Sequence, residues 1–411
     1  MKLCCDFEFG DRTVRSEVYL EQDKNTCSVS VTIIPCETIN ILTIKNSNLF
    51  LKSIINSSKL LLERTPILFL EGNCKEIKGK LSSAKLLTQD FPSSDEKVSI
   101  YFYLTNIPYS FKPVSYTIEE EGQQTITRQA DFDKIHISGQ SEIIIKPHLE
   151  ETISHIAIIN EVPLSSLHDL TELMDSICWL ISFGSGCMCS IAKVEMLHNE
   201  QVISLEYKPI ETSTLNKVNK VNKVNKVIYR DDDVIDFIQN TYSYYQQYLN
   251  DYKLKKLINL GILANNTPYL QVKTLLMCNF LEILRYNYAE INVRDGNFTQ
   301  KRDDFFNVAD QGQRNRLSFN IILQDFCQTN QLNDWIPLYK EIRNKMIHQG
   351  EVIGTNFNEK DQNYLKLHHF CDRVMLTLLN WDKASGYYIP RDCPNKKNAN
   401  ERGINRIKFI K

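Results

Sequence analysis

The period of the hydrophobic pattern changes once along this chain, and that change most constrains how the chain can fold. Up to about residue 150, apolar residues alternate with polar ones in short runs separated by clusters of Asn, Asp, Gly, Ser and Pro. From about residue 229 onward, they recur every three or four residues instead. The first pattern is typical of half-buried β-strands and the second of amphipathic helices. The sequence therefore predicts an α+β protein, with a mostly antiparallel β domain followed by an all-α helical bundle.

The strand pattern is clearest in six segments of the first part. Each is an alternating run bounded by turn-forming residues, which argues for antiparallel strands. After them, the spacing predicts an amphipathic helix near 164–181 and two more strands at 191–197 and 201–207. We therefore assign residues 1–212 to one β-rich N-terminal domain. The six predicted strands are 16–22, 27–34, 41–51, 66–72, 98–107 and 141–147.

A repeat separates the two halves. The triplet Asn-Lys-Val occurs four times from Asn216 to Val227. A period of three fits neither the helix nor the strand, so no face of this stretch stays apolar. We interpret residues 213–228 as a linker or surface loop, whose lysines are solvated rather than bound to RNA.

The second half has helical periodicity throughout. An acidic run from Asp231 to Asp233 suits the positive end of a helix dipole at its start. Short connections between the helices favour a bundle, which we place at 229–390, followed by a basic C-terminal tail at 391–411. The predicted helices are 231–264, 271–291, 316–327, 334–350 and 359–382.

The charge of the chain is balanced overall but uneven along its length. It has 48 Lys and Arg against 50 Asp and Glu, a net charge of −2, which excludes a protein that coats nucleic acid over its whole surface. Residues 229–411, however, carry 25 basic and 21 acidic residues, and the tail from Arg391 onward carries 7 and 2. A local cationic site for nucleic acid is therefore compatible with the composition.

Cysteine usage and the N-terminus favour a cytoplasmic protein. Twelve cysteines in 411 residues are too few for a disulfide scaffold, and no apolar signal segment follows Met1. The uncharged stretch from Ser176 to Ala192 is shorter than the ~20 residues that a membrane span needs, and Gly184 and Gly186 interrupt it. We interpret this stretch as a buried helix that turns into a strand, and we expect no membrane partner.

The sequence predicts no metal and no cofactor. Cys187 with Cys189, and His368 with His369 and Cys371, lack the ligand spacing of a zinc site. Buried structural cysteines and a histidine pair on a helix surface explain them more simply. The glycine motifs that bind phosphate or dinucleotides, the paired-histidine zinc motif and the serine nucleophile elbow do not occur in the sequence. Nucleotide hydrolysis and hydride transfer are thereby disfavoured.

The segment YKEIRNKMIHQG, residues 339–350, is the most informative one. Winding it at 100° per residue places an apolar stripe on the side that a bundle buries. Arg343, Asn344 and His348 lie on the other side, with Ile347 between them. The helix therefore presents a strip of basic, amide, apolar and imidazole groups. The apolar stripe consists of Trp335, Leu338, Tyr339, Ile342 and Met346.

Arg343 and His348 carry the groups that metal-independent RNA cleavage needs. A guanidinium clamps a phosphate through two N–H groups, and an imidazole transfers protons near neutral pH. The nucleophile is then the 2′-hydroxyl of the RNA, so neither a metal ion nor a protein nucleophile is required. His348 also lies just before Gly350, where a helix end and its dipole favour the imidazolium.

This arrangement resembles the signature of HEPN-domain ribonucleases, an Arg and a polar residue followed a few positions later by a His. Arg343, Asn344 and His348 match it, after an amphipathic helix with an internal Glu282 and before a long closing helix. The resemblance is firmest over about 229–390. With a β-rich domain in front, the layout is similar to that of HEPN proteins of anti-phage defence (ApeA-like). It implies a HEPN-type fold for the C-terminal bundle.

The resemblance further implies an endoribonuclease that acts in anti-phage defence or as a toxin. Its implied partners are an RNA substrate, a second copy of the chain in a homodimer, and a phage-derived trigger. Both protomers would contribute to one composite site, in which Arg343 holds the phosphate and His348 acts as general base or acid. Asn344 would position the substrate or the partner's motif. Attack by the 2′-hydroxyl would leave a 2′,3′-cyclic phosphate and a 5′-hydroxyl.

Two supporting roles and two alternatives remain open. Lys345 would bind the RNA, and Glu282 would support the site, unless it only forms an ion pair with Arg285 three residues on. In the first alternative, the HEPN module is catalytically inactive, and the strip on the helix serves only dimerisation or partner binding. In a further alternative, the N-terminal domain is the active element and the bundle its regulator.

Overall fold

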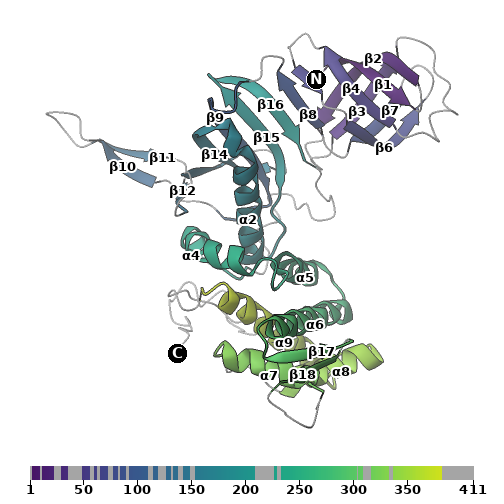
Figure 1. The fold of residues 1–411 in the computed structure, drawn as a ribbon, viewed down its shortest axis with the longest axis vertical. Helices are drawn as coiled ribbons and strands as arrows, with labels where there is room; N and C mark the ends of the chain where they lie inside the picture. The colour runs from purple at the N-terminus through teal and green to yellow at the C-terminus, as the bar shows by residue number, and fades with distance from the viewer. Residues whose placement is uncertain are drawn as a thin grey trace. The chain divides into compact units, whose positions relative to one another are not determined.

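The α+β class predicted from the sequence is confirmed by a computed structural model of the chain (Figure 1). The chain divides into two compact units, one formed by Met1–Cys178 and Cys189–Lys223, the other by Trp179–Met188 and Val224–Lys411. The structure describes residues 2–9, 12–22, 29–35, 49–55, 60–62, 65–72, 77–81, 84–88, 92–109, 114–118, 126–130, 133–137, 142–148, 153–208, 226–228, 233–302, 304–308, 316–332 and 337–381. Most of the Asn-Lys-Val repeat, the whole basic tail and Trp335 lie outside these ranges.

Six antiparallel strands near the N-terminus close on themselves into a ring. Along β3, the buried Val31 and Ile33 alternate with partly or fully exposed neighbours such as Ile34, as the period-two pattern predicts. Only the last part of the predicted strand 41–51 lies within the described residues, in β4. The order around the ring is β1 (Lys2–Phe9), β2 (Arg12–Gln22), β3 (Val29–Pro35), β7 (Ile77–Leu81), β6 (Thr65–Gly72) and β4 (Leu49–Ile55).

A second, eight-stranded antiparallel sheet completes the first unit. Its central strand β9 (Lys97–Thr105) buries Val98, Ile100, Phe102 and Leu104 on one face, which supplies much of the core. A separate hairpin pairs β10 (Val114–Ile118) with β11 (Ile126–Ala130). The sheet order is β12 (Asp133–Ile135), β13 (Ile143–Pro147), β14 (Ile153–Pro163), β9, β15 (Ile191–His198), β16 (Gln201–Tyr207), β8 (Ala84–Thr88) and β5 (Leu60–Leu62).

Helix α2 (Leu167–Ser185) follows a single 3₁₀ turn, Leu164–Ser166, and buries Leu173, Met174 and Ile177. Its last residues belong to the second unit, although the sequence placed the whole helix in the N-terminal domain. As expected, the stretch from Ser176 to Ala192 is a buried helix end that turns into strand β15. Within the described part of the chain, no helix has the length and apolar character that crossing a membrane would require.

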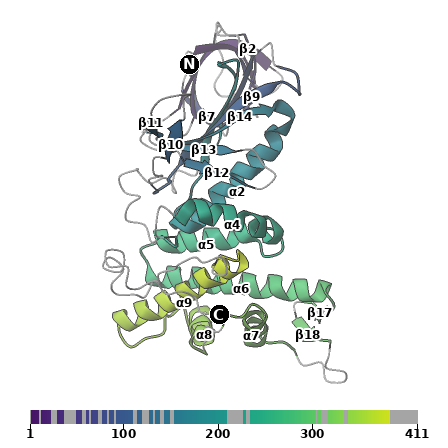
Figure 2. The same ribbon diagram turned by 90° about the vertical axis from the view of Figure 1, so that its left-hand side faces the viewer.

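The second unit is built from helices arranged around the longest of them, α6 (Leu270–Arg294). Figure 2 shows α4 (Asp233–Tyr248) and α5 (Leu254–Asn266) on one side of α6, with α7 (Phe319–Thr329) and α8 (Pro337–Gln349) on the other. The closing helix α9 (Phe357–Leu378) also packs on α6. The prediction of one helix over 231–264 is wrong, because the chain turns between α4 and α5 and Lys253 adopts a positive φ of 53° there.

A short hairpin between α6 and α7 was not predicted from the sequence. It pairs β17 (Phe298–Lys301) with β18 (Asp304–Asn307). Arg316 forms an isolated bridge with Phe306 of this hairpin, and the Leu317 N–H donates to the Phe305 carbonyl at 2.8 Å. Ser318 then begins α7 by accepting a hydrogen bond from the Ile321 N–H. These contacts fix the segment before α7 against the hairpin.

Candidate active site around Arg343 and His348

The buried side of α8 is the one that the sequence predicts. Tyr339, Ile342 and Met346 are 5%, 0% and 4% exposed, one helical turn apart. The Tyr339 ring also stacks on Phe370 of α9, with ring centres 4.7 Å apart. This stripe fixes α8 in the bundle, so the side chains of the opposite face have defined directions.

Arg343 is held on several sides by neighbours from three helices. Its Nε donates to Glu282 Oε1 of α6 at 2.7 Å, and its Nη2 forms an ion pair with the same oxygen. Its Nη1 donates to Asn344 Oδ1 at 3.0 Å. The guanidinium carbon lies 4.9 Å from the centre of the Phe319 ring of α7. Three of the five N–H groups of Arg343 therefore have a partner among the described residues.

Glu282 forms the ion pair with Arg285 that the sequence left open, and it also contacts Arg343. Its Oε2 accepts from Arg285 Nε at 3.2 Å, which is the ion pair expected at a spacing of three on a helix. Its Oε1 binds Arg343. One carboxylate thus joins two guanidinium groups, and Asn344 turns toward Arg343 rather than away from it. Glu282 therefore orients Arg343 and neutralises part of its charge.

His348 lies on the exposed part of α8, and Lys345 lies on a half-buried part of it. His348 is in the last helical turn and its side chain is exposed. On a helix, five residues turn through about 500°, so His348 points about 140° away from Arg343, and no hydrogen bond joins the two within the described residues. Lys345 Nζ lies 3.3 Å from Glu351 Oε2, in an ion pair at the surface. One copy of α8 therefore presents the guanidinium and the imidazole in different directions.

The loop after His348 is tied to the start of α9. Gly350 ends α8 with a positive φ of 70°. At Gly354, where φ is 144°, an added Cβ would lie 2.7 Å from the Lys360 backbone nitrogen, so only glycine fits. Asn356 caps α9 by accepting from the Glu359 N–H at 3.0 Å. A glycine turn and a helix cap thus order the connection between α8 and α9.

Arg343 lines a surface cavity of about 500 Å³ that the sequence did not reveal. Arg285 from α6 and Arg316 from the segment before α7 line it as well. Arg316 pairs with Asp304 of β18, Nε to Oδ1 at 2.8 Å. No spacing in the sequence could have brought these residues together, because they come from separate segments that only the tertiary fold makes adjacent. The remaining lining residues are Glu282, Asp304, Phe305, Leu317, Ser318 and Phe319.

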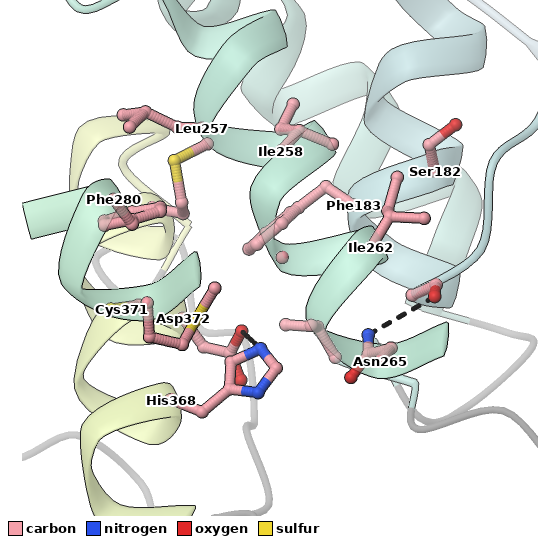
Figure 3. A pocket seen from close by; sticks show the side chains of 15 residues that line it. Ser182, Phe183, Leu257, Ile258, Ile262, Asn265, Phe280, His368, Cys371 and Asp372 are labelled. Carbon is pink, nitrogen blue, oxygen red and sulfur yellow. Dashed lines mark hydrogen bonds and ion pairs between the residues drawn. The ribbon is translucent and has the colours of Figure 1, made fainter. Parts of the chain in front are cut away.

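A second, much smaller cavity lies inside the helical unit (Figure 3). Its volume of about 20 Å³ is enough for about one water molecule. His368 and Asp372 line it from α9, and the His368 Nδ1 lies 2.7 Å from the Tyr364 hydroxyl. The expectation that His368 is on a helix surface is wrong, since it is 1% exposed. The size of this cavity points to packing rather than ligand binding.

The cysteines of the rejected zinc site are buried, as expected. Cys187 and Cys189 are 0% and 3% exposed, and burial raises the pKa of the Cys187 thiol to about 11. Within the described residues, no group of three or more His, Cys, Asp or Glu side chains is arranged to hold a metal ion.

Comparison with known proteins adds no assignment. No protein-family model matches the sequence, and no curated protein and no solved structure matches it. The groups that the candidate site offers are an oriented guanidinium at a cationic cavity and an exposed imidazole on the same helix.

Proposed function

We propose that this protein is a metal-independent endoribonuclease of the HEPN type, which cuts RNA at a composite site formed by Arg343 and His348 of two copies of the chain. One observation carries the proposal. Helix α8 buries its apolar stripe and leaves an oriented guanidinium and an exposed imidazole on its other sides. These are the two groups that cleavage by the internal 2′-hydroxyl requires.

In the proposed reaction, His348 removes the proton of the 2′-hydroxyl or protonates the leaving oxygen. The 2′-oxygen attacks the adjacent phosphorus, and the bond from phosphorus to the 5′-oxygen of the next nucleotide breaks. The products are a 2′,3′-cyclic phosphate and a 5′-hydroxyl, which takes up one proton. Arg343 stabilises the charge on the phosphate with the N–H groups that Glu282 and Asn344 leave available.

The composite site follows from the helix geometry. Because Arg343 and His348 point about 140° apart on one helix, a single α8 cannot surround one phosphate with both. In a two-fold dimer, each Arg343 can face the His348 of the partner subunit. Ile347 is 40% exposed next to His348 and offers an apolar contact for such an interface. Asn344 supports Arg343, and Lys345 supplies a further positive charge for the RNA.

We further propose that cleavage serves anti-phage defence or toxicity, as the resemblance to HEPN defence proteins implies. The β-rich first unit would then receive the trigger, such as a phage-derived component. Activity would therefore be tested both with the isolated protein and in cells challenged with phage.

The test is cleavage of total RNA and transfer RNA in the presence of EDTA. Wild type should produce fragments with 2′,3′-cyclic phosphate ends, and His348→Ala should produce none. Gln349→Ala is the matched control, because Gln349 is the exposed neighbour of His348 on the same helix, and it should cleave like wild type. Equal cleavage by wild type and His348→Ala would show that His348 is not catalytic.

A catalytically inactive interaction module is the second candidate. It is favoured by the engagement of the Arg343 guanidinium by Glu282 and Asn344, which is also what a purely structural arginine would show. Under this alternative, wild type cleaves no RNA with or without phage lysate, and Arg343→Ala loses its dimers. Cleavage by wild type would exclude this alternative.

A further inference from the structure

We propose that the cavity lined by Arg285, Arg316 and Arg343 is a binding site for a nucleoside phosphate, and that its ligand is a nucleotide of an RNA strand. Its volume of about 500 Å³ falls within the range of small-molecule sites, about 300–1,000 Å³. The binding itself does not depend on catalysis. Only the statement that the bound RNA is also the substrate rests on the proposed function.

The charge of the cavity suits a phosphate. Three arginines and two carboxylates, those of Glu282 and Asp304, line it, so its lining carries one net positive charge. Arginine is the side chain best shaped to bind phosphate oxygens in pairs. The cavity also borders the N-terminal end of α7 at Ser318, where the helix dipole adds to the positive potential.

The two carboxylates orient the arginines without using all their donors. Arg285 and Arg316 both bind their carboxylate partners through Nε. Their terminal nitrogens are the groups that remain for phosphate oxygens at the cavity. Because the guanidinium groups are already oriented, less side-chain entropy is lost when a ligand binds.

An aromatic ring gives the cavity a surface for a base. Phe305 and Phe319 both line it. Phe305 is 1% exposed and makes an edge-to-face contact with Tyr286, so it forms a fixed wall of the cavity rather than a stacking surface. Phe319 is only partly buried and lies against the guanidinium of Arg343. Bases of single-stranded RNA stack on such a ring with little sequence preference. A ring beside arginines therefore matches a nucleotide better than it matches inorganic phosphate.

The experiment measures binding of a short, fluorescently labelled RNA in which every 2′-hydroxyl is methylated. Such a strand cannot be cleaved by 2′-hydroxyl attack, so the fluorescence anisotropy reports binding alone. Arg316→Ala should weaken binding about tenfold, the loss expected for a charged hydrogen bond. It should also lower the slope of log affinity against log salt by about 0.7, one phosphate contact on a single strand.

Arg294→Ala is the matched control. Arg294 is, like Arg316, an exposed arginine paired with an aspartate, Asp251, with Nη1 to Oδ1 at 3.0 Å, but it does not line the cavity. This variant should bind like wild type. Arg316 is 71% exposed in its side chain, so its loss should leave folding intact, which a thermal unfolding curve checks.

The carboxylate variants predict a change in the opposite direction. Asp304→Asn removes a negative charge from the cavity lining and should tighten RNA binding several-fold, because the gain in net positive charge outweighs the orientation that Asp304 gives Arg316. Asp251→Asn removes the same charge from the ion pair with Arg294 and should leave RNA binding unchanged. Competition with adenosine monophosphate and with inorganic phosphate identifies the ligand. Displacement by the mononucleotide at low concentration would show that a free nucleotide is the ligand and overturn the RNA assignment.

Unchanged RNA binding in Arg316→Ala, or an equal loss in Arg294→Ala, would overturn the proposal. These results are separable from those on catalysis. If wild type binds the methylated RNA through Arg316 but cleaves no unmodified RNA, the ribonuclease function fails and the binding site stands. If His348→Ala abolishes cleavage while Arg316→Ala binds normally, the function stands and this inference fails.

Discussion

The carboxylate of Glu282 on α6 binds the guanidinium of Arg343 on α8, across 61 positions of sequence. The same carboxylate also binds Arg285, so one acidic side chain sets the direction of two arginines. The two ends of the Glu282–Arg343 pair are 27% and 22% exposed in their side chains, which shields the pair partly from water. This contact joins the helix of the candidate site to the centre of the bundle.

Glu282→Gln should lower the free energy of unfolding by about 1–3 kcal/mol, the value of a charged hydrogen bond in a partly buried position. The neutral amide binds Arg343 less strongly and turns a donor toward one of the two guanidinium groups. Urea unfolding measures the change. Glu290→Gln, an exposed position on the same helix, should change stability little. An equal effect of both substitutions would contradict a specific role for Glu282.

Ile347→Glu should dissociate the proposed dimer. A carboxylate next to its own symmetry mate loses the apolar contact and adds repulsion at the interface. Light scattering of the eluting protein measures the mass of the species in solution. Ile321→Glu, an exposed apolar position on α7 at 48% exposure, should leave the dimer intact. A monomeric wild type would contradict the composite site directly.

The free energy of unfolding should depend on pH through the titration of His155. Its side chain is 5% exposed on β14, and burial lowers its pKa from 6.5 to about 4. Because the folded-state pKa is lower than the unfolded one, the unfolded chain binds more protons between these values. The contribution of His155 to the free energy of unfolding is therefore fully present above about pH 6.5 and is lost as the pH falls toward 4. Between pH 7 and 5 this loss is about 2 kcal/mol.

His155→Leu should remove that part of the pH dependence, because leucine binds no proton. Urea unfolding at pH 7 and pH 5 measures it, and the difference between the two pH values should be about 2 kcal/mol smaller in the variant than in wild type. His168→Leu is the matched control. The His168 side chain is 81% exposed, so this variant should keep the pH dependence of wild type. An identical pH dependence of wild type and His155→Leu would contradict the prediction.

Cys278 should be unreactive in the folded protein. It is 0% exposed, and burial raises its pKa to about 12, although the nearby Arg343 lowers it. The reactive thiolate is therefore absent near neutral pH. Peptide mapping after treatment with a maleimide at pH 7.5 should find Cys278 labelled only in urea. Rapid labelling without urea would show that the helical unit opens locally around α6.

The sequence predicts those parts of the fold that depend on one periodic segment. The stripe of Tyr339, Ile342 and Met346 is buried as the winding of the helix predicts, and strand β9 alternates as expected. The break before α5 was missed, because neither a glycine nor a proline marks the positive φ of Lys253.

The candidate site could be predicted only in its local part. Arg343 and His348 are visible because they share one helix, so their spacing is in the sequence. The sequence left a supporting role of Glu282 open but did not predict its contact with Arg343, since no pattern shows how α6 meets α8. Arg316 could not be found at all, because the unpredicted hairpin β17–β18 determines where it lies.

The order of the loop between α8 and α9, which follows His348, has a consequence for regulation. Gly354 and the cap of α9 already order this loop. Little backbone entropy of the loop would therefore be lost if RNA bound at His348. Under the proposed function, a trigger would therefore gain nothing by folding this part of the chain. It would act instead on the association of two chains into the proposed composite site. Below the dissociation constant of the dimer, the activity per molecule would then rise in proportion to protein concentration, and activation would amount to a change in local abundance.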